Sequence, residues 1–391
     1  MKKENTFAIL LPIMVTFFTM GFVDMVGTAT NYVKSDLNLT DTVANVFTTM
    51  VFFWFLIFAV PTGVLMNRIG RRRTVLISLV ITIISLLIPI INYSYISMLI
   101  SFSLLGIGNT LMQVSLNPLL SSIVSNERLA SSLTLGQFVK AIASFVAPLI
   151  ATGVALRFGD WKYLFPIFMV IAVMAIIWLG FSSIEEPKRD NNKDVTFGQC
   201  FGLLGNGVIL LLFFGIMCHV GIDIGINVSA PRILIERLPH INDINDANYA
   251  TSVYFLFHTA GCFTGTFLLT RFAAKKIFAI SVGLMTIAIA GFFTFGNETA
   301  LCVCIALTGF GNSNIFPIIL SKAMLYIPDK RNEVTGLMMM GIFGGAILLF
   351  FMGLASDALS SQAGALLIIG GSILYLIFLS VKMKEKANSI A

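Results

Sequence analysis

Residues 43–73 read VANVFTTMVFFWFLIFAVPTGVLMNRIGRRR, an apolar run that ends in a basic cluster. The hydrocarbon core of a bilayer is about 30 Å thick and a helix rises about 1.5 Å per residue, so about 20 apolar residues cross it. The part from 43 to 67 is longer than that and contains no charged residue. Lys and Arg collect in cytoplasmic loops. The stretch therefore predicts a membrane-spanning helix followed by a cytoplasmic turn.

The rest of the chain has the same apolar character. Of its 391 residues 57% are hydrophobic and 11% are charged, whereas a soluble domain has about 25% charged residues. Apolar stretches of suitable length lie near 7–33, 43–67, 74–93, 95–123, 129–156, 161–183, 206–235, 248–271, 275–295, 298–325, 333–357 and 362–382. We therefore expect an all-α membrane protein with twelve transmembrane helices. The first stretch has no small-residue cleavage site, so we expect a retained span and not a signal peptide.

The positions of Lys and Arg orient this bundle. With both termini in the cytoplasm, 19 of the 25 Lys and Arg lie on the inner side, as the positive-inside rule requires. Five lie on the outer side and one inside a span, in this order: Lys34, Arg157, Lys162, Arg232, Arg237 and Lys140. We expect a multi-pass protein of the cell inner membrane with both termini cytoplasmic. The net charge of +6 follows from this bias and gives no indication of nucleic-acid binding.

A repeated motif predicts an internal duplication. The sequence Gly106-Ile-Gly108-Asn109 recurs as Gly309-Phe-Gly311-Asn312, 203 residues later, and each copy is followed by a helix proline. Glycine pairs are also common in membrane helices because they let backbones approach closely, but here the offset is close to half the length of the chain. We expect two pseudo-symmetric six-helix halves, residues 1–183 and 206–391, joined by a cytoplasmic linker at 184–205.

The turn after the second span carries a signature. Gly63-Val-Leu65-Met-Asn67-Arg68-Ile-Gly70-Arg71-Arg72-Arg73 resembles the motif G-x-L-x-D-R-x-G-R-R of the major facilitator superfamily, with Asn67 where an aspartate is usual. The resemblance implies the major facilitator fold and a cytoplasmic gate. The expected gate residues are Gly63, Asn67, Arg68, Gly70 and Arg71. The arginines could pair with carboxylates and helix carboxyl ends when the inner side is shut. Positive-inside charge alone would explain the arginines but not the glycines.

Within that superfamily the chain is most similar to the fucose–proton symporter family. The similarity runs from residues 39–66 through Asn117-Pro118 and Phe263-Thr-Gly265-Thr to Gly344-Gly345 and Ser356-Asp357-Ala358. That family moves neutral hexoses inward with proton or sodium gradients. The resemblance therefore implies a sugar importer coupled to a cation gradient.

This sequence departs from the family pattern at its functional positions. Gln113 replaces a glutamate, and Gly27 replaces an aspartate, with Asp24 about one turn earlier. Gln137 is retained, but Lys140 replaces an asparagine three residues later. The family's substrate, fucose, and its coupling ion, the proton, therefore cannot be assigned directly to this protein.

Ionisable residues within spans are rare and indicate function. Asp24 and Asp223 each lie about 17 residues into their spans and are the expected ion-coupling residues. Asp24 and Lys140 differ in depth by less than about 10 Å, so an ion pair or a bridge through substrate is feasible. The alternative is a permanent salt bridge that fixes helix packing, although buried pairs contribute little to stability.

Amide side chains supply the expected sugar site. Asn109, Gln113 and Asn117 follow an i, i+4, i+8 spacing on one helix face. The expected substrate-binding residues are Asn109, Gln113, Asn117, Gln137, Lys140, Asn227, Asn312 and Asn314. Amides can bond a hydroxyl in both directions, but they also hold membrane helices together. His219 and His258 could relay protons or pack between helices.

We therefore expect a secondary transporter that imports a monosaccharide by proton- or sodium-coupled alternating access. Two alternatives stay open: transport of an acidic sugar or organic anion paired with Lys140, and a solute sensor that does not transport. No nucleophile, metal or nucleotide motif points to an enzyme or an ATP-driven pump. The five cysteines lack metal-ligand spacing. We expect no metal and no cofactor, the bilayer, a sugar and a cation as partners, no nucleic acid, and a monomer.

Overall fold

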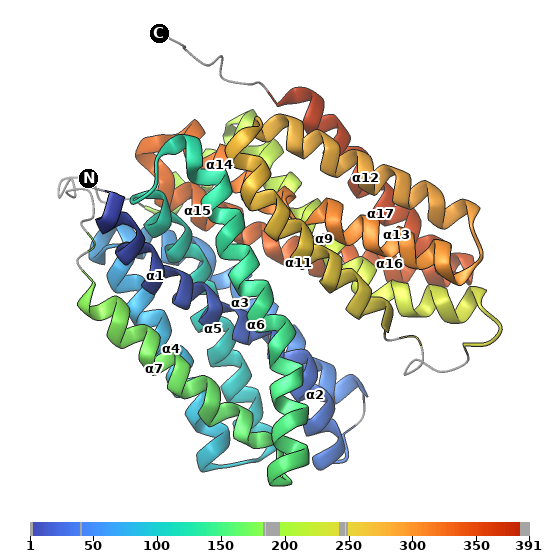
Figure 1. The fold of residues 1–391 in the computed structure, drawn as a ribbon, viewed down its shortest axis with the longest axis horizontal. Coiled ribbons are helices and arrows are strands. Elements are labelled where there is room, and N and C mark those ends of the chain that lie inside the picture. Colours follow the sequence, from blue (N-terminus) through green and yellow to red (C-terminus); the bar gives the residue numbers. More distant parts are fainter. Residues whose placement is uncertain are drawn as a thin grey trace. The chain divides into compact units, whose positions relative to one another are not determined.

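The computed structural model describes residues 3–39, 41–182, 184, 196–241, 247 and 249–383. The regular elements in these ranges are helices, and no strand occurs in them (Figure 1). Backbone polar groups within a bilayer have no water to bind, and an α-helix satisfies them internally. The expected all-α fold is confirmed.

The long helices match the predicted spans. In the described part of the chain eleven helices are long and apolar enough to cross a membrane, and a shorter apolar helix, Ile9–Asp24, precedes them. Nine of the eleven are formed by single helices or end in one, namely α3 (Asp41–Ile69), α4 (Arg71–Ile91), α5 (Tyr95–Ser121), α6 (Leu129–Phe158), α7 (Leu164–Phe181), α9 (Gly207–Arg237), α11 (Tyr249–Arg271), α12 (Ala274–Thr294) and α17 (Ala363–Lys382). All eleven, together with the interrupted first span, make the twelve-helix fold that the sequence predicts.

Three spans are broken where the sequence predicts continuous stretches. The first consists of α1 (Lys3–Met20), the 3-10 turn η1 (Gly21–Asp24) and α2 (Met25–Asp36). The tenth breaks between α13 (Glu298–Asn312) and α14 (Ile315–Tyr326), and the eleventh between α15 (Arg331–Met340) and α16 (Gly344–Leu359). Broken helices in transporters leave backbone groups and side chains available for ligands and ions. The breaks therefore direct attention to the residues beside them.

Contacts divide the chain into two compact units. The first contains residues 1–126, 136–205 and 324–340, and the second contains 127–135, 206–323 and 341–391. Most of the linker expected at 184–205 lies outside the described residues. Its described part includes the short helix α8 (Phe197–Gly202), which packs against α3 and α15 within the first unit.

In the first unit the Gly-x-Gly motif marks two close helix contacts. A Cβ at Gly106 would lie 2.8 Å from the carbonyl oxygen of Val51 on α3. A Cβ at Gly108 would lie 2.8 Å from Thr82 Oγ1 on α4. Each glycine thus allows α5 to approach one neighbouring helix, as small residues do in membrane bundles.

The second copy of the motif makes the equivalent contacts in the second unit. A Cβ at Gly309 would lie 2.5 Å from the carbonyl oxygen of Tyr254 on α11. A Cβ at Gly311 would lie 2.7 Å from the carbonyl oxygen of Ser281 on α12. In both units the first glycine contacts the second span of its half and the second glycine contacts the third. The motif therefore has the same packing role twice.

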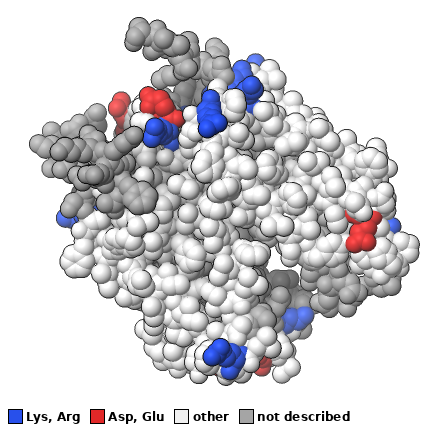
Figure 2. Space-filling view, in the orientation of Figure 1, with Lys and Arg blue, Asp and Glu red and all other residues white. Residues whose placement is uncertain are grey.

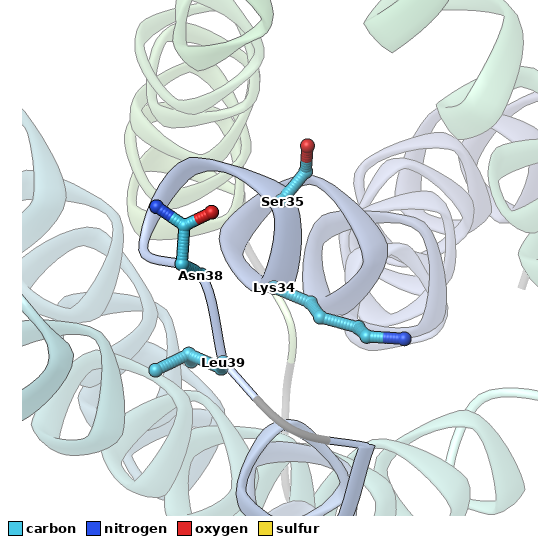
Figure 3. Close-up of a pocket in the computed structure, with 4 residues that line it drawn as sticks. All are labelled: Lys34, Ser35, Asn38 and Leu39. Carbon is cyan, nitrogen blue, oxygen red and sulfur yellow. The ribbon is translucent and has the colours of Figure 1, made fainter.

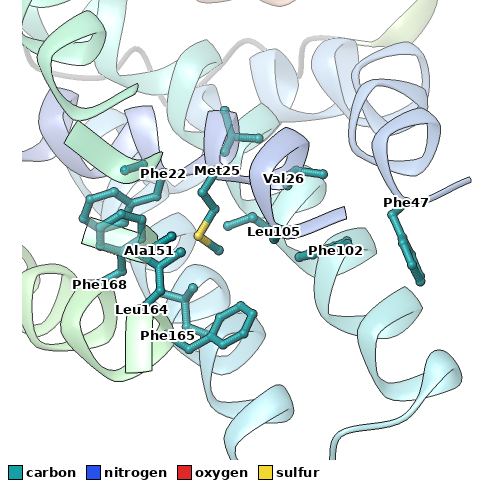
Figure 4. Close-up of a cluster of buried hydrophobic side chains, with 14 of the residues drawn as sticks. Phe22, Met25, Val26, Phe47, Phe102, Leu105, Ala151, Leu164, Phe165 and Phe168 are labelled. Atoms are coloured by element: carbon teal, nitrogen blue, oxygen red, sulfur yellow. The ribbon is translucent and has the colours of Figure 1, made fainter. Parts of the chain in front are cut away.

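An aromatic core fixes the first broken span in the first unit. Phe22 of η1 stacks on Phe168 of α7 with ring centroids 4.0 Å apart. Met25 and Phe165 are buried in the same cluster, which Figure 4 shows. Burying large apolar side chains holds η1 in place.

The end of α2 is held by Asp36. Its Oδ2 accepts hydrogen bonds from Tyr93 Oη at 2.7 Å and from Trp161 Nε1 at 2.9 Å. Burial and the neighbouring Asp36 carboxylate raise the pKa of Tyr93 well above its usual value, so the phenol keeps the proton that it donates. The break at η1 and the carboxyl end of α2 are therefore both anchored.

The surface fits a lipid environment. Figure 2 shows a face on which Lys, Arg, Asp and Glu are few. Large apolar side chains are exposed on the helices, among them Ile91 (75%), Leu156 (84%) and Phe181 (86%). Extended exposed apolar surface marks contact with another apolar phase, so the chain is a multi-pass membrane protein.

Candidate functional site

An ion pair lies at the break of the first span. Lys140 Nζ of α6 lies 3.5 Å from Asp24 Oδ2 of η1. Ser144 Oγ, one turn further along α6, contacts the same carboxylate and lies 3.1 Å from the Lys140 carbonyl oxygen. The side chains of Lys140 and Asp24 are 22% and 34% exposed. The pair is therefore only partly enclosed by protein.

Two glycines bring the first span onto α6. A Cβ at Gly21 would lie 2.5 Å from the Lys140 carbonyl oxygen. A Cβ at Gly136 would lie 2.7 Å from the ring of Phe17. The absence of both side chains lets α1 and η1 lie directly against α6. Asp24 follows Gly21 by three residues and so reaches the lysine.

The predicted amide stripe on α5 is buried. Asn109, Gln113 and Asn117 are 4%, 7% and 0% exposed, and Asn117 Nδ2 donates to the Gln113 carbonyl oxygen at 2.6 Å. Among the described residues, Asn109 Oδ1, Asn117 Oδ1 and the Nε2 of Gln137 on α6 are buried without a hydrogen-bond partner. Buried polar atoms normally bind protein or water, so these atoms can accept or donate to a ligand. No hydrogen bond among the described residues joins this stripe to Asp24 or Lys140.

A second ionisable cluster lies in the second unit. Tyr254 of α11 donates to Asp223 Oδ1 of α9 at 2.5 Å, and His258 Nδ1 lies 3.6 Å from the same oxygen. Asn227 Nδ2 donates to the Asp223 carbonyl oxygen at 2.8 Å, and its Oδ1 is buried without a hydrogen-bond partner in the described chain. Asp223 and His258 are 30% and 19% exposed. Asp223 is thus part of a cluster, and Asn227 Oδ1 is an acceptor beside it.

Asn312 and Asn314 bond within the protein. Asn312 is fully buried, its Oδ1 lies 2.8 Å from His219 Nδ1, and its Nδ2 donates to Tyr254 Oη at 3.1 Å. Asn314 Nδ2 donates to the Gly261 carbonyl oxygen at 3.2 Å. The structure shows these amides connecting α9, α11 and α13, and substrate binding by them stays a prediction. His219 makes the interhelical hydrogen bond that was one of its two expected roles.

The predicted gate glycines have specific geometries. Gly70 adopts φ +97°, a backbone conformation that other residues rarely adopt, and links α3 to α4. A Cβ at Gly63 would lie 2.9 Å from the Asn332 carbonyl oxygen of α15. On α15, a Cβ at Gly336 would lie 2.8 Å from the Ala59 carbonyl oxygen. The two helices therefore cross at a glycine on each side.

Polar side chains extend this crossing in the first unit. Asn67 Nδ2 donates to Glu333 Oε1 at 2.9 Å, and Asn332 Nδ2 donates to Asn67 Oδ1 at 2.6 Å. Arg71 Nε donates to Asn332 Oδ1 at 2.7 Å. Glu333 on the facing helix thus supplies the carboxylate that is missing at position 67. Glu333 is buried, with 6% of its surface exposed.

Neighbouring arginines bind helix carboxyl ends. Arg72 donates to the carbonyl oxygens of Leu179 and Gly180, at the end of α7, at 3.0 and 2.7 Å. Arg331 donates to the Ser121 carbonyl oxygen at the end of α5 at 3.1 Å. Helix carboxyl ends carry unpaired carbonyl groups and partial negative charge, which favour cations. Arg68 lies in the last turn of α3.

Sequence reasoning missed four contributors: Ser144, Arg331, Asn332 and Glu333. The last three form a polar triplet immediately before an apolar span. A polar triplet at the start of one span and a basic turn at the end of another could have predicted that the two segments bind each other. Nothing in the sequence distinguishes Ser144 from other serines in spans.

An open hollow of about 570 Å³ lies at the far end of α2 and is separate from these clusters. It is lined by Lys34, Ser35, Asn38 and Leu39, as Figure 3 shows. Asp24 immediately precedes the opposite end of α2. The residues that line the hollow include one basic side chain, Lys34, and no acidic one. The ion pairs and the amides described above are therefore the better candidate site.

The described residues contain no group of three or more His, Cys, Asp or Glu that could hold a metal ion. The five cysteines are free thiols. The absence of metal and cofactor stays a prediction.

Comparisons with known proteins agree with this architecture. The chain is 24% identical over 379 residues to a glucose/galactose transporter of Brucella abortus biovar 1 (strain 9-941), covering 92% of this chain and 90% of the relative. It is 21% identical over 358 residues to an L-fucose-proton symporter of Escherichia coli (strain K12), covering 82% and 80%. A crystal structure of the E. coli fucose:proton symporter FucP matches the fold with a TM-score of 0.84 at 16% identity, covering 96% and 98%.

A family model decides the classification. The model of the Major Facilitator Superfamily matches residues 13–239 and 213–390, which together cover nearly the whole chain. The all-helical architecture of the described residues agrees with that match. The chain belongs to the Major Facilitator Superfamily, whose members are membrane transporters and not enzymes.

Proposed function

We propose that this protein is a secondary active transporter that imports a monosaccharide by cation-coupled alternating access. The observation that carries the proposal is the partly exposed Asp24–Lys140 ion pair at the break of the first span. The printed names of similar proteins support a sugar, since they include glucose/galactose transporters and an L-fucose-proton symporter. A proton or a sodium ion is the expected coupling cation.

The ion pair gives the coupling a physical basis. A charge within the membrane is costly and is retained where it serves a pathway or a relay. With Lys140 and Ser144 beside it, ionised Asp24 is compensated. When Asp24 takes up a proton or a sodium ion, Lys140 loses that counter-charge and its contacts rearrange. Cation binding at Asp24 therefore changes the packing of α6 against the first span, and Asp223 is the second candidate for coupling.

The amides supply groups suited to a neutral sugar. The unpaired atoms Asn109 Oδ1, Asn117 Oδ1 and Asn227 Oδ1 are acceptors, and Gln137 Nε2 is a donor. Sugar hydroxyls both donate and accept, so they can satisfy such atoms. The pairing of Lys140 with Asp24 favours an uncharged substrate, because the ammonium already has a counter-charge. An acidic sugar remains the alternative and is an outcome of the test below.

The crossing of α3 and α15 is the proposed cytoplasmic gate. Its support is the contact set of Gly63, Asn67 and Arg71 with α15. Gly70 and Arg68 belong to the same turn. In this proposal the contacts hold the inner side shut and must break for inward release. We also propose two six-helix halves at 1–183 and 206–391, a monomer in the inner membrane, and both termini in the cytoplasm.

Uptake by proteoliposomes tests the function. Purified wild type is expected to accumulate radiolabelled glucose, galactose or fucose when a proton or sodium gradient is imposed, and not galacturonate. Asp24→Asn is expected to abolish accumulation and to retain sugar exchange at equal concentrations, because the neutral side chain cannot couple. Accumulation by Asp24→Asn would move the coupling to Asp223. Uptake of galacturonate with no uptake of neutral hexoses would replace the neutral-sugar assignment.

A further inference from the structure

A chain of hydrogen bonds in the second unit ends at the Asp223 carboxylate. Asn312 Nδ2 lies 3.1 Å from Tyr254 Oη, and Tyr254 Oη lies 2.5 Å from Asp223 Oδ1. An amide nitrogen can only donate, so Tyr254 Oη accepts from Asn312 and gives its own proton to Asp223. Asn312 Oδ1 accepts from His219 Nδ1 at 2.8 Å. In these three hydrogen bonds the donors all point toward Asp223, and such aligned bonds strengthen one another.

This arrangement fixes Asp223 as an acceptor. Tyr254 is fully buried, and Asn312 is held from two sides by His219, whose carbonyl oxygen lies 3.3 Å from Asn312 Nδ2. The hydroxyl of Tyr254 therefore cannot turn away without leaving buried polar atoms unpaired, which is unfavourable. The carboxylate of Asp223 is thus the stationary member of the cluster.

His258 is the member that can change its charge. Its Nδ1 lies 3.6 Å from Asp223 Oδ1, the same oxygen that Tyr254 binds, and its side chain is 19% exposed. Imidazole is the side chain whose ordinary pKa, about 6.5, falls within the physiological range. A protonated imidazole can pair with the fixed carboxylate, and the ring is only partly enclosed by protein.

Other titratable groups near His258 are few among the described residues. The helix α9 supplies Asp223 and His219, α11 itself supplies Tyr254 and Cys262, and the facing residue of α13 is the neutral Asn312. The lysines of α12, which also packs against α11, are Lys275 and Lys276 at its first turn, beyond the end of α11. The segment 127–135 meets α11 at Thr266, through Ser131, and carries Glu127 and Arg128 at its start. The carboxylate that reaches His258 is therefore that of Asp223.

We propose that His258 is a proton-binding residue of the second unit, with Asp223 as its counter-ion and with Tyr254 and Asn312 as positioning residues. Hydronium transfers a proton to the unprotonated ring nitrogen of His258, so one N–H bond forms, one O–H bond of hydronium breaks and water is released. The resulting imidazolium pairs with the Asp223 carboxylate. The site is distinct in sequence and in partners from Asp24 and Lys140, so proton binding at His258 can be tested separately from the role of that pair.

Proton binding is tested on the purified protein without any substrate. The chain contains three histidines, so their ring signals can be assigned by NMR with the variants His219→Gln, His240→Gln and His258→Gln. Each signal is followed from pH 5 to pH 9 in wild type and in Asp223→Asn. The His258 midpoint in wild type is expected to lie higher than in Asp223→Asn, by about one pH unit or more, because the nearby carboxylate favours the imidazolium.

His240 is the matched control. Its Nε2 lies 3.0 Å from Glu298 Oε2, so it is also a histidine paired with a carboxylate, but its side chain is 63% exposed and its partner is not Asp223. Its midpoint is expected to be the same in both proteins. An unchanged His258 midpoint in Asp223→Asn, or a His258 that does not titrate, overturns the proposal. If Asp223→Asn does not fold, Asp223→Glu keeps the charge but moves it, and the midpoint must still shift.

The consequence for transport rests on the proposed function. Sugar exchange by Asp24→Asn is expected to keep a pH dependence, and adding His258→Gln is expected to flatten it. A pH dependence that survives His258→Gln overturns this consequence. If wild type moves no sugar at all, the proposed function fails while the NMR titration still decides whether His258 binds a proton.

Discussion

An ammonium within a membrane span costs about 2.5–3.5 kcal/mol on insertion scales unless it finds a counter-charge or water. Lys140 has Asp24 as that counter-charge at 3.5 Å, and both side chains remain partly exposed. Desolvation can cancel much of the attraction in a buried pair, so the pair is weak support for stability. Its partial exposure instead suits a function that alternates between paired and unpaired states.

The residue-scale prediction concerns Lys140→Ala. Loss of the ammonium leaves the Asp24 carboxylate without its counter-charge, so the pH dependence of uptake is expected to differ from that of wild type. Neutral-sugar binding should weaken only moderately, because the amides remain. The matched control is Lys162→Ala, since Lys162 pairs with Asp160 at 3.2 Å near the end of a helix and is more exposed. A pH optimum that stays in place would show that Asp24 is not the group that titrates during uptake.

At the scale of helices, the gate contacts can be followed through Cys200. This thiol is buried on α8, which packs against α3 and α15. Burial raises the pKa of Cys200 to about 11, so the reactive thiolate is scarce at neutral pH. Slow labelling of the Cys200 thiol is therefore expected as long as the contacts between α3 and α15 stay in place.

Breaking the crossing should expose Cys200. In a background with the other four cysteines replaced by alanine, Arg71→Ala and Asn332→Ala are each expected to raise the rate of maleimide labelling. The double variant should label little faster than Asn332→Ala alone, because Asn332→Ala already removes the 2.7 Å hydrogen bond between the two side chains. Arg73→Ala is the control, since Arg73 is an exposed residue of the same cluster. An equal effect of Arg73→Ala would attribute the result to net charge and not to the contact.

The repeated glycines give a second prediction at this scale. Gly309→Ala would place a Cβ 2.5 Å from the Tyr254 carbonyl oxygen, and backbone can relieve such a contact only by moving α13 away from α11. We expect the free energy of unfolding to fall by about 1–3 kcal/mol, which is typical of overpacking, and the melting temperature to fall with it. Gly283→Ala on α12 is the control, because nothing lies within 4 Å of a Cβ there, and it should be neutral or slightly stabilising. Equal melting temperatures for the two variants would remove the packing role of the motif.

For the whole molecule, the apolar periodicity and length of the stretches were enough to predict the all-α fold and the number of spans. The breaks at Gly21–Asp24 and Gly341–Phe343 could not be predicted, because they depend on side chains of other helices that fill or leave space. The Asp24–Lys140 pair could be anticipated, since charges within spans are rare. The bonding of Asn312 to Tyr254 and His219 could not, because an amide has the same sequence signal whether it holds helices or binds sugar.

The whole-molecule prediction distinguishes the substrate classes by ligand-induced stability. A ligand that binds the folded protein raises its stability by about 2.7 kcal/mol at 100 times its Kd, whatever the transport rate. Neutral hexoses are expected to raise the melting temperature of the detergent-solubilised protein, because the amides can bond hydroxyls while Lys140 stays paired with Asp24. Galacturonate should not, since its carboxylate would have to displace Asp24 from Lys140. Asp24→Asn sharpens the test, because it leaves Lys140 without this counter-charge and should allow galacturonate to stabilise the variant. Stabilisation of wild type by galacturonate alone would show that the substrate itself supplies the counter-charge, and the neutral-sugar proposal would then be wrong.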